Sequence, residues 1–160
     1  MRYRRLVGKR LLEALLVLIA AVSCGPAPSY TSSHGAEYWF DGAAWPPAQI
    51  EAQEAGFEDS VVSSGLYTRE QVERALSTSR VQVYPDKFRC SSSPTTWCAG
   101  DEDYEQLSVE SDGCPGKSAL THEVAHWLEF QAKGITDYTH TVELELWKAA
   151  DAEQPGSCKD

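Results

Sequence analysis

Two histidines and a glutamate within residues 122–126 have the types and spacing of a catalytic zinc motif. The segment reads His122-Glu123-Val124-Ala125-His126. On a helix, residues four apart are separated by about 40° around the axis and about 6 Å along it, so both imidazoles can bind one ion. Imidazole is a good Zn²⁺ ligand, and Glu123 lies close enough to take a proton from a metal-activated water. The segment therefore predicts zinc-dependent hydrolysis with Glu123 as the general base.

The motif requires a helix, and the flanking sequence predicts one over residues 118–133. Ser118 is a favourable N-cap, and Gly134 stands where a left-handed residue commonly closes a helix. Before this helix, apolar residues alternate with polar ones, which predicts a strand over residues 105–110. We expect the apolar face of the helix to pack in the core while the other face carries the histidines.

Catalytic zinc sites have three protein ligands, and His140 is the preferred candidate for the third. Three of the four histidines lie within residues 122–160, and only a short loop separates Gly134 from His140. Such a loop can return the chain to the metal. Within it, Asp137 either orients a ligand histidine or caps the next turn. Tyr138 either donates a hydrogen bond to a tetrahedral intermediate or packs against the domain.

The motif on its predicted helix resembles the active site of zincin-type zinc metallopeptidases. The resemblance implies that the two motif histidines bind zinc, that Glu123 is the base, and that residues 105–110 form the edge strand that binds an extended peptide substrate. The metzincin branch is excluded, because Glu129 and Ala132 stand where that branch has a glycine and a third histidine.

Thermolysin-like enzymes take their third ligand, a glutamate, from a later helix. This resemblance implies Glu143 or Glu145 as alternatives to His140. Glu129 lies four residues before Lys133 and is expected to form an ordinary exposed ion pair with it.

The remaining patterns predict an α+β fold. Thr68 and Gln71 form a capping-box signal for a helix over residues 68–78, and alternation predicts a strand over residues 81–84. We expect a minimal zincin-like domain over residues 37–160, with a short antiparallel sheet packed on the motif helix and two further helices. Three segments complete this expectation: residues 37–67 as an irregular wrap rich in aromatic side chains, residues 90–100 as a loop rich in Ser and Thr, and residues 141–153 as a helix.

The five cysteines favour an exported protein. Without Cys24, an even number remains, as expected of a disulfide framework in an oxidising compartment. Four cysteines allow three pairings. We favour Cys90 with Cys98, which closes a short loop, and Cys114 with Cys158, which ties back the C-terminal segment. A four-thiolate zinc site is disfavoured because no CxxC spacing occurs.

The N-terminal segment has the pattern of a lipoprotein signal peptide over residues 1–23. A basic stretch precedes an apolar run that is too short to cross a bilayer, and the run ends in Ala21-Val22-Ser23-Cys24. This ending resembles the bacterial lipobox, which implies acylation of Cys24 and an anchor in the cell envelope. Gly25 after the cysteine resembles the pattern sorted to the outer membrane. Residues 24–36 are expected to form a flexible linker in which His34 is solvated.

Composition and charge narrow the classes of partner. The chain has 160 residues, a hydrophobic content of 42% and a net charge of −10, which fits one globular domain. Such an acidic surface repels phosphate backbones, so nucleic-acid binding is excluded. The sequence predicts a monomeric zinc metallopeptidase that acts on peptides. The alternative is a catalytically inactive surface lipoprotein that acts as a binding module and in which zinc is structural or absent.

Overall fold

The computed structural model describes residues 26–103, 105–111, 113 and 119–152. The predicted signal peptide and Cys24 lie outside these residues and stay predictions. The described residues form eleven elements, seven strands and four helices. In chain order they are β1 (Tyr30–Thr31), β2 (Glu37–Phe40), α2 (Pro47–Ser64), α3 (Arg69–Thr78), β3 (Arg80–Tyr84), β4 (Phe88–Cys90), β5 (Ser93–Cys98), β6 (Gly100–Glu102), β7 (Leu107–Glu110), α4 (Ala119–Lys133) and α5 (Leu144–Ala150). Within the described ranges, no helix is both long and apolar enough to span a bilayer.

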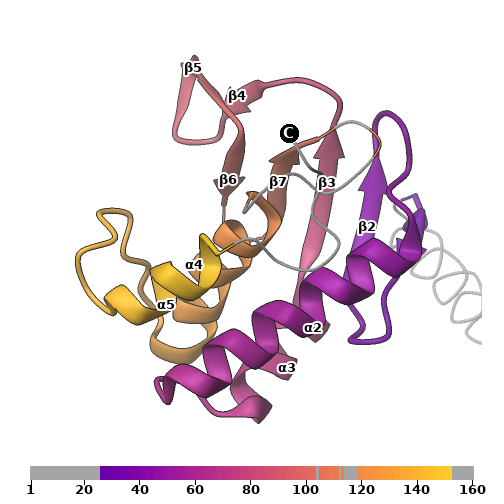
Figure 1. Ribbon diagram of the computed structural model, residues 1–160. Coiled ribbons are helices and arrows are strands. Elements are labelled where there is room, and N and C mark those ends of the chain that lie inside the picture. The colour runs from indigo at the N-terminus through magenta and orange to yellow at the C-terminus, as the bar shows by residue number, and fades with distance from the viewer. Residues whose placement is uncertain (1–25, 104, 112, 114–118, 153–160) are drawn as a thin grey trace, which may run out of the picture.

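The α+β class is confirmed, but the expectation of an antiparallel sheet is wrong. The main sheet has five strands in the order β1-β2-β3-β7-β6, and its three central strands are parallel (Figure 1). The two outer pairs, β1 with β2 and β6 with β7, are antiparallel. Parallel neighbours require a crossover connection, which α2 and α3 supply between β2 and β3.

The helix α2 makes the parallel pairing of β2 and β3 possible, and it lies where the sequence predicts an irregular segment. Pro47 occupies the first helical position, where its missing N–H costs nothing, and Gly65 closes the helix with a φ of 76°. The face of α2 that packs inward mixes apolar Phe57 with buried polar Gln53 and Glu54. This mixture weakens the apolar periodicity that would have indicated a helix. The described part of the chain therefore contains three helices besides α4, not two.

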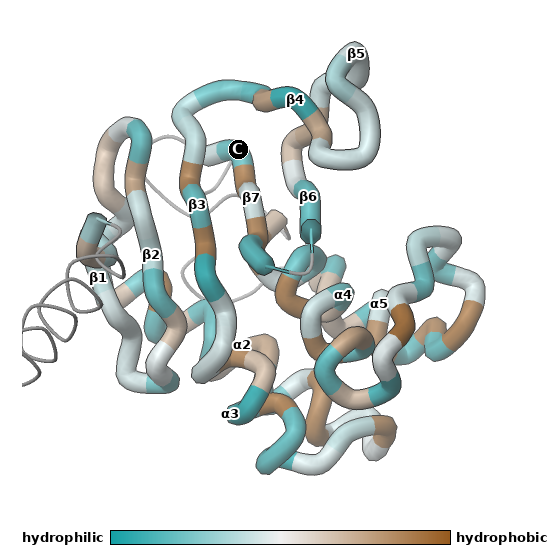
Figure 2. The backbone as a smooth tube through the Cα atoms, turned by 180° about the vertical axis from the view of Figure 1, so that it is seen from behind, coloured by the Kyte–Doolittle hydropathy of each residue, from teal (hydrophilic) through white to brown (hydrophobic). Residues whose placement is uncertain are grey.

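The core forms where the helices cover one face of the sheet (Figures 1 and 2). In β3 and β7 every second side chain is buried, as expected of strands with one face against a core. The helices contribute their apolar stripes to the same cluster. Its main members are Tyr38, Ile50, Phe57, Val61, Val72, Leu76, Val81, Val83, Leu107, Val109, Leu120, Val124, Leu128 and Leu146.

The predicted capping box of α3 is confirmed. The Thr68 hydroxyl accepts a hydrogen bond from the Gln71 backbone N–H, and the Gln71 side chain accepts one from the Thr68 N–H. The motif helix α4 is also confirmed, and Gly134 follows it with a φ of 71°. The last helix, α5, is shorter than residues 141–153, because Glu143 before it has a left-handed backbone that cannot continue a helix.

The expected loop over residues 90–100 is instead a hairpin of β4 and β5. Its disulfide between Cys90 and Cys98, with a Cα–Cα distance of 5.3 Å, confirms that predicted pair. The Arg89 guanidinium lies 3.8 Å from the ring centroid of Trp97 on the neighbouring strand. These two contacts hold a Ser- and Thr-rich segment in strand form. The second predicted pair, Cys114 with Cys158, lies outside the described residues.

Residues 26–36 are not the expected flexible linker but part of the folded domain. His34 is half-buried, with Nδ1 2.9 Å from a Glu54 oxygen and Nε2 3.1 Å from a Glu58 oxygen. The Tyr30 hydroxyl and the Ser33 backbone N–H both donate to Glu51. The residues that predict a flexible linker instead form the start of a β1–β2 hairpin, whose polar groups bind to α2.

Candidate metal centre

Three imidazoles meet between α4 and the loop that follows it. His122, His126 and His140 each offer a ring nitrogen, and these atoms all lie within 4.8 Å of one another. The Nε2 atoms of His126 and His140 are 3.2 Å apart. Two nitrogens bound to one tetrahedral Zn²⁺ at about 2.0–2.1 Å would be about 3.3 Å apart, so this donor set fits zinc.

The helix α4 places two of these rings by its periodicity. Its opposite face carries Leu120, Val124 and Leu128 into the core, so His122 and His126 point away from the core. The Thr121 hydroxyl donates to the Ala150 carbonyl at 2.6 Å, which ties α4 to the end of α5.

The third histidine is placed by a loop with its own hydrogen bonds. The backbone N–H of Asp137 donates to the buried carboxylate of Glu129 at 2.7 Å. The Asp137 carboxylate then accepts from the Thr139 hydroxyl at 2.6 Å, from the Val142 N–H at 2.7 Å and from the Thr139 N–H at 3.0 Å. These bonds lower the pKa of Asp137 to about 2. His140 has a φ of 54°, a left-handed conformation that turns the chain back toward α4.

This loop corrects the sequence interpretation of Glu129 and decides between the two alternatives for Asp137. Glu129 is buried and anchors the loop, so it is not an exposed partner of Lys133. Asp137 shapes the backbone rather than orienting a ligand ring.

The alternative third ligands point elsewhere. Glu143 accepts a hydrogen bond from the Tyr67 hydroxyl at 2.5 Å and pairs with Lys133. Glu145 is exposed and pairs with Lys148. The geometry therefore favours His140 as the third ligand.

Two of the three rings, those of His126 and His140, favour the neutral form that binds metal. Burial, with the neighbouring rings of His122 and His140, lowers the pKa of His126 to about 4. Burial also lowers the pKa of His140. A lowered histidine pKa means that the ring is uncharged at neutral pH, so its lone pair is available to a cation without loss of a proton.

The ring of His122 has a carboxylate partner that the sequence did not reveal. Asp151, at the C-terminal end of α5, has an oxygen 2.8 Å from His122 Nδ1. This contact leaves Nε2 of His122 for the metal and fixes the orientation of the ring, as carboxylates beside metal-binding histidines do. Because 29 residues separate the two, no local pattern in the sequence indicates the pair.

We expect Asp151→Ala to lower zinc affinity by about 10–100-fold, because the His122 ring loses its orienting and polarising partner. Asp151→Asn should lower it less, since the amide oxygen can still accept a hydrogen bond. Competition titration against a chelating dye measures the change, with Glu145→Gln on the same helix as the control. Unchanged zinc affinity in Asp151→Ala would show that Asp151 does not contribute to zinc binding.

An indole closes the inner side of the centre. Trp147 is buried, and its ring centroid lies 4.3 Å from that of His140, 4.7 Å from that of His126 and 5.5 Å from that of His122. Its Nε1–H donates to the Val142 carbonyl at 3.0 Å. Trp147 thus fixes both the rings and the loop, and it excludes water from one side of the site.

Glu123 is 7% exposed and lies beside the strand β6. In the part of the chain that the structure describes, its carboxylate has no hydrogen-bond partner. Burial, with the nearby charges of Asp101 and Glu102, raises the pKa of Glu123 to about 8. A cation at the histidines would oppose this shift by favouring the carboxylate. A buried carboxyl with a raised pKa beside such a cluster is typical of a general base.

Gly100 is the residue that makes room for this carboxylate. A Cβ at Gly100 would lie 2.1 Å from Glu123 Oε1, closer than any real contact. We therefore expect Gly100→Ala to displace Glu123 and to lower kcat/KM about 100-fold, because small misplacements of a catalytic group have effects of that size. Zinc content should stay unchanged, and steady-state kinetics with metal analysis tests both. Full activity in this variant would show that the position of the carboxylate is not critical.

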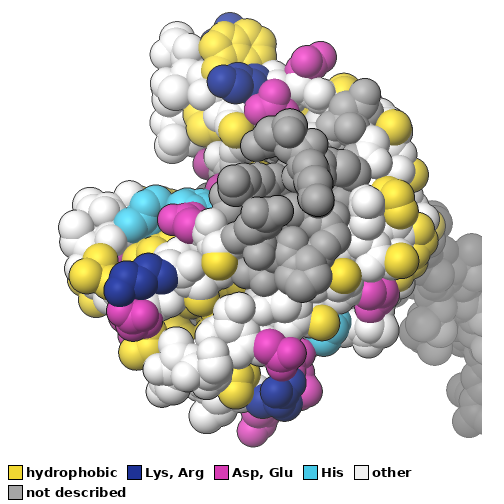
Figure 3. Space-filling model, viewed as in Figure 1, with side chains coloured by type: hydrophobic (Ala, Val, Ile, Leu, Met, Phe, Trp, Pro, Cys, Tyr) yellow, Lys and Arg dark blue, Asp and Glu magenta, His cyan; other side chains and the backbone are white. Residues whose placement is uncertain are grey.

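The edge of the sheet near the centre is β6, not the strand over residues 105–110. That strand, β7, is paired on both sides, whereas no described strand pairs with the outer edge of β6. The β4–β5 hairpin and the loop after α4 rise on either side of this region. Figure 3 shows a notch there, with histidine and acidic side chains at its margin.

A second group of possible ligands, His34, Glu51 and Glu54, lies on the far side of α2. Both His34 nitrogens already face carboxylates, and Tyr38 also donates to Glu54 at 2.7 Å. This group holds the N-terminal hairpin on α2.

No family model, curated protein or solved structure matches the chain. The function is therefore argued from the geometry of the site.

Proposed function

We propose that this protein is a zinc-dependent metallopeptidase. One observation carries the proposal: three imidazoles within 4.8 Å of one another, with the buried carboxylate of Glu123 on the same helix as two of them. A site that only held a structural ion would not need a buried, unpaired carboxylate beside it. Structural zinc sites fill all four positions with protein ligands, whereas three histidines leave one position open.

The residues of the chain have distinct roles in this reaction. When bound, a Zn²⁺ ion supplies Lewis-acid charge that makes water acidic near neutral pH and polarises a peptide carbonyl. Glu123 accepts the proton of the attacking water and passes it to the nitrogen of the leaving amine as the C–N bond breaks. Asp151 and Trp147 hold the histidine rings in place.

The substrate is an extended peptide that pairs with the outer edge of β6. This edge offers backbone N–H and C=O groups, and β6 lies directly against Glu123 through Gly100. A peptide added as a further strand would bring its backbone carbonyls past the metal centre. The cleft is bounded by the β4–β5 hairpin and the loop that carries Tyr138, with the Tyr138 hydroxyl 3.3 Å from a Glu102 oxygen.

Removal and return of the metal tests the proposal. We expect the zinc-loaded protein to cleave a mixed peptide library, chelation to lower the rate at least about 100-fold, and zinc to restore it. Product mass spectrometry identifies the cleaved bonds, and a peptide-bond cut confirms the reaction class. Tight zinc binding without cleavage of any peptide would favour the binding module instead.

A further inference from the structure

A cavity of about 490 Å³ lies on the face of the sheet opposite the core. Its floor is made by side chains of β2 and β3 that alternate with the buried core residues Tyr38, Val81 and Val83. The lining consists of residues 26–28, Glu37, Trp39, Arg80, Gln82 and Gln106. The helix α4 and its histidines belong to the layer on the other face of the sheet, so this cavity is separate from the candidate metal centre (Figure 1).

The strand register places the lining side chains in two rows. Glu37 on β2 is the neighbour of Arg80 on β3, and Trp39 is the neighbour of Gln82. Gln106, one residue before β7, extends the first row on the other side of β3. Three neighbouring strands therefore hold an indole, two carboxamides and an ion pair side by side.

Trp39 gives the cavity a flat apolar surface with a fixed orientation. Its indole Nε1–H donates to the Pro26 carbonyl at 3.1 Å. The Ser29 N–H donates to the Tyr38 carbonyl at 2.7 Å, which ties the wall of the cavity to β2, and the rings of Pro26 and Pro28 restrict the backbone of that wall. Among the described residues, no other aromatic ring and no cation packs on the indole.

The polar groups of the cavity are two open amides and an ion pair without net charge. In the part of the chain that the structure describes, the side-chain amides of Gln82 and Gln106 have no hydrogen-bond partner. Arg80 Nε lies 3.6 Å from Glu37 Oε2, so the charges cancel here although the protein has a net charge of −10. A ligand that fits these groups is uncharged, and it both donates and accepts hydrogen bonds.

These conditions exclude several kinds of ligand. A peptide cannot add as a strand, because β2 and β3 are each paired on both edges. An anion is repelled by Glu37 beside Arg80, and a wholly apolar ligand would leave the two amides without partners. A sugar ring meets every condition, since its hydroxyls donate and accept hydrogen bonds while the C–H bonds of one face pack on the negative face of an indole.

We propose that this cavity binds a sugar ring of an uncharged glycan. Its volume lies in the range of small-molecule sites, about 300–1,000 Å³. The inference goes beyond the proposed peptidase function, because it gives the protein a second binding site on the other face of the sheet. A protein held on a glycan by this site keeps its metal centre free for a peptide.

Titration calorimetry of the full-length protein with four soluble tetrasaccharides tests the site. They are the neutral tetramers of glucose, N-acetylglucosamine, mannose and xylose, and we expect at least one to bind with a Kd below about 1 mM. Trp39→Ala should weaken this binding at least about tenfold, because the stacking surface is lost. Gln82→Leu should weaken it about tenfold, because it removes the amide and keeps the bulk of the side chain. Gln82→Leu leaves the core face of β3 unchanged, so it decides the question if Trp39→Ala does not fold.

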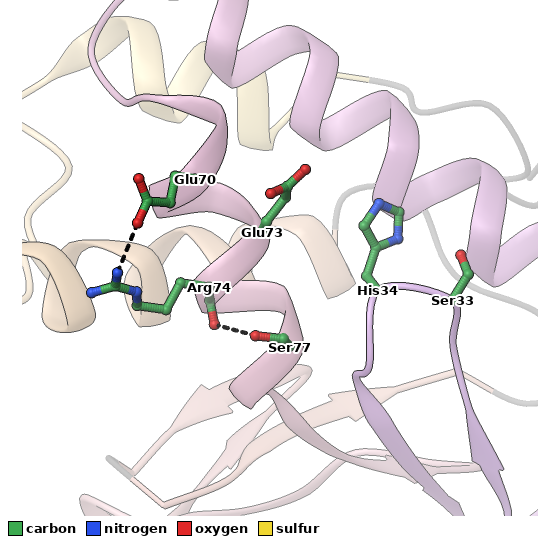
Figure 4. A pocket seen from close by; sticks show the side chains of 6 residues that line it. All are labelled: Ser33, His34, Glu70, Glu73, Arg74 and Ser77. Carbon is green, nitrogen blue, oxygen red and sulfur yellow. Dashed lines mark hydrogen bonds and ion pairs between the residues drawn. The ribbon is translucent and has the colours of Figure 1, made fainter.

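Two variants elsewhere in the molecule are matched controls. Trp97→Ala removes an indole that is 57% exposed on the β4–β5 hairpin, away from any cavity wall described above. Glu73→Gln changes a cavity of the same volume between the N-terminal hairpin and α3 (Figure 4). That cavity is lined by Glu70 and Arg74, paired at 3.1 Å, and no indole from the described residues lines it. Both variants should bind the tetrasaccharide as the wild-type protein does.

The same titrations after chelation of metal separate this site from the metal centre. We expect unchanged sugar affinity, whatever the result of the peptidase assays. Loss of sugar binding on chelation would place the sugar at the metal centre and overturn the inference. It is also overturned if none of the four tetrasaccharides binds, if sulfated tetrasaccharides bind more tightly than neutral ones, or if Trp39→Ala and Gln82→Leu bind as the wild type does. Peptides retained by the wild type but not by Trp39→Ala, with no sugar bound, would assign the cavity to peptides instead.

Discussion

Replacement of Glu123 by glutamine is expected to lower kcat/KM by about 10³-fold while zinc stays bound. Glutamine has nearly the same shape but cannot accept the proton of the attacking water, and general bases contribute about 10²–10⁴-fold. Because Glu123 is buried with a pKa of about 8, it is largely uncharged in the metal-free protein at neutral pH. The neutral amide should therefore fold at least as well, and the thermal midpoint of the metal-free protein should not fall.

Steady-state kinetics, metal analysis and thermal unfolding of one preparation measure these three expectations together. Glu145→Gln is the matched control, because it makes the same chemical change at an exposed residue of α5. Equal activity in Glu123→Gln and wild type would refute the role of Glu123 as base. Loss of zinc in the same variant would instead indicate that the carboxylate is a ligand.

The second large effect is expected from replacement of His140, the proposed third zinc ligand. We expect His140→Ala to lower zinc affinity at least about 100-fold, because removal of a direct ligand exceeds the effect of removing its hydrogen-bond partner. Peptide cleavage at limiting zinc should fall in parallel. Since His140 lies in a loop and is only half-buried, the fold should survive the change.

Glu143→Gln is the control for this experiment, because Glu143 was the rival ligand. Its contacts with Tyr67 and Lys133 predict a loss of about 1–3 kcal/mol in the free energy of unfolding and no loss of zinc. The reverse result, with zinc retained in His140→Ala and lost in Glu143→Gln, would show that Glu143 is the third zinc ligand. Competition titration and urea unfolding distinguish the two outcomes.

The parts of the fold that sequence analysis predicted correctly depend on neighbours in the chain. The capping box joins Thr68 and Gln71, which are three positions apart, and the disulfide joins Cys90 and Cys98, which are eight positions apart. The helix of the histidine motif follows from its apolar face and from Gly134 after it. Such features are set by local hydrogen bonds and side-chain periodicity, which a single sequence displays directly.

The incorrect predictions concern features that depend on residues far apart in the chain. The helix α2 buries the polar side chains of Gln53 and Glu54, so its pattern is not amphipathic. The partners of Glu54, His34 and Tyr38, come from other parts of the chain. Without that helix no crossover was expected, and the parallel pairing of the central strands was missed with it. The prediction that His34 is solvated is wrong for the same reason, because its carboxylate partners lie 20 and 24 residues away.

The sequence by itself determined which side chains the proposed reaction uses: a histidine pair and a glutamate on one helix, with His140 within reach. Only the tertiary structure decided how that chemistry is completed. It placed Asp151 on His122, made space for Glu123 at Gly100, and put β6 rather than β7 at the edge of the sheet. Each of these contacts joins residues more than 20 positions apart or depends on strand order. They arise from the packing of the whole domain, which no local pattern encodes.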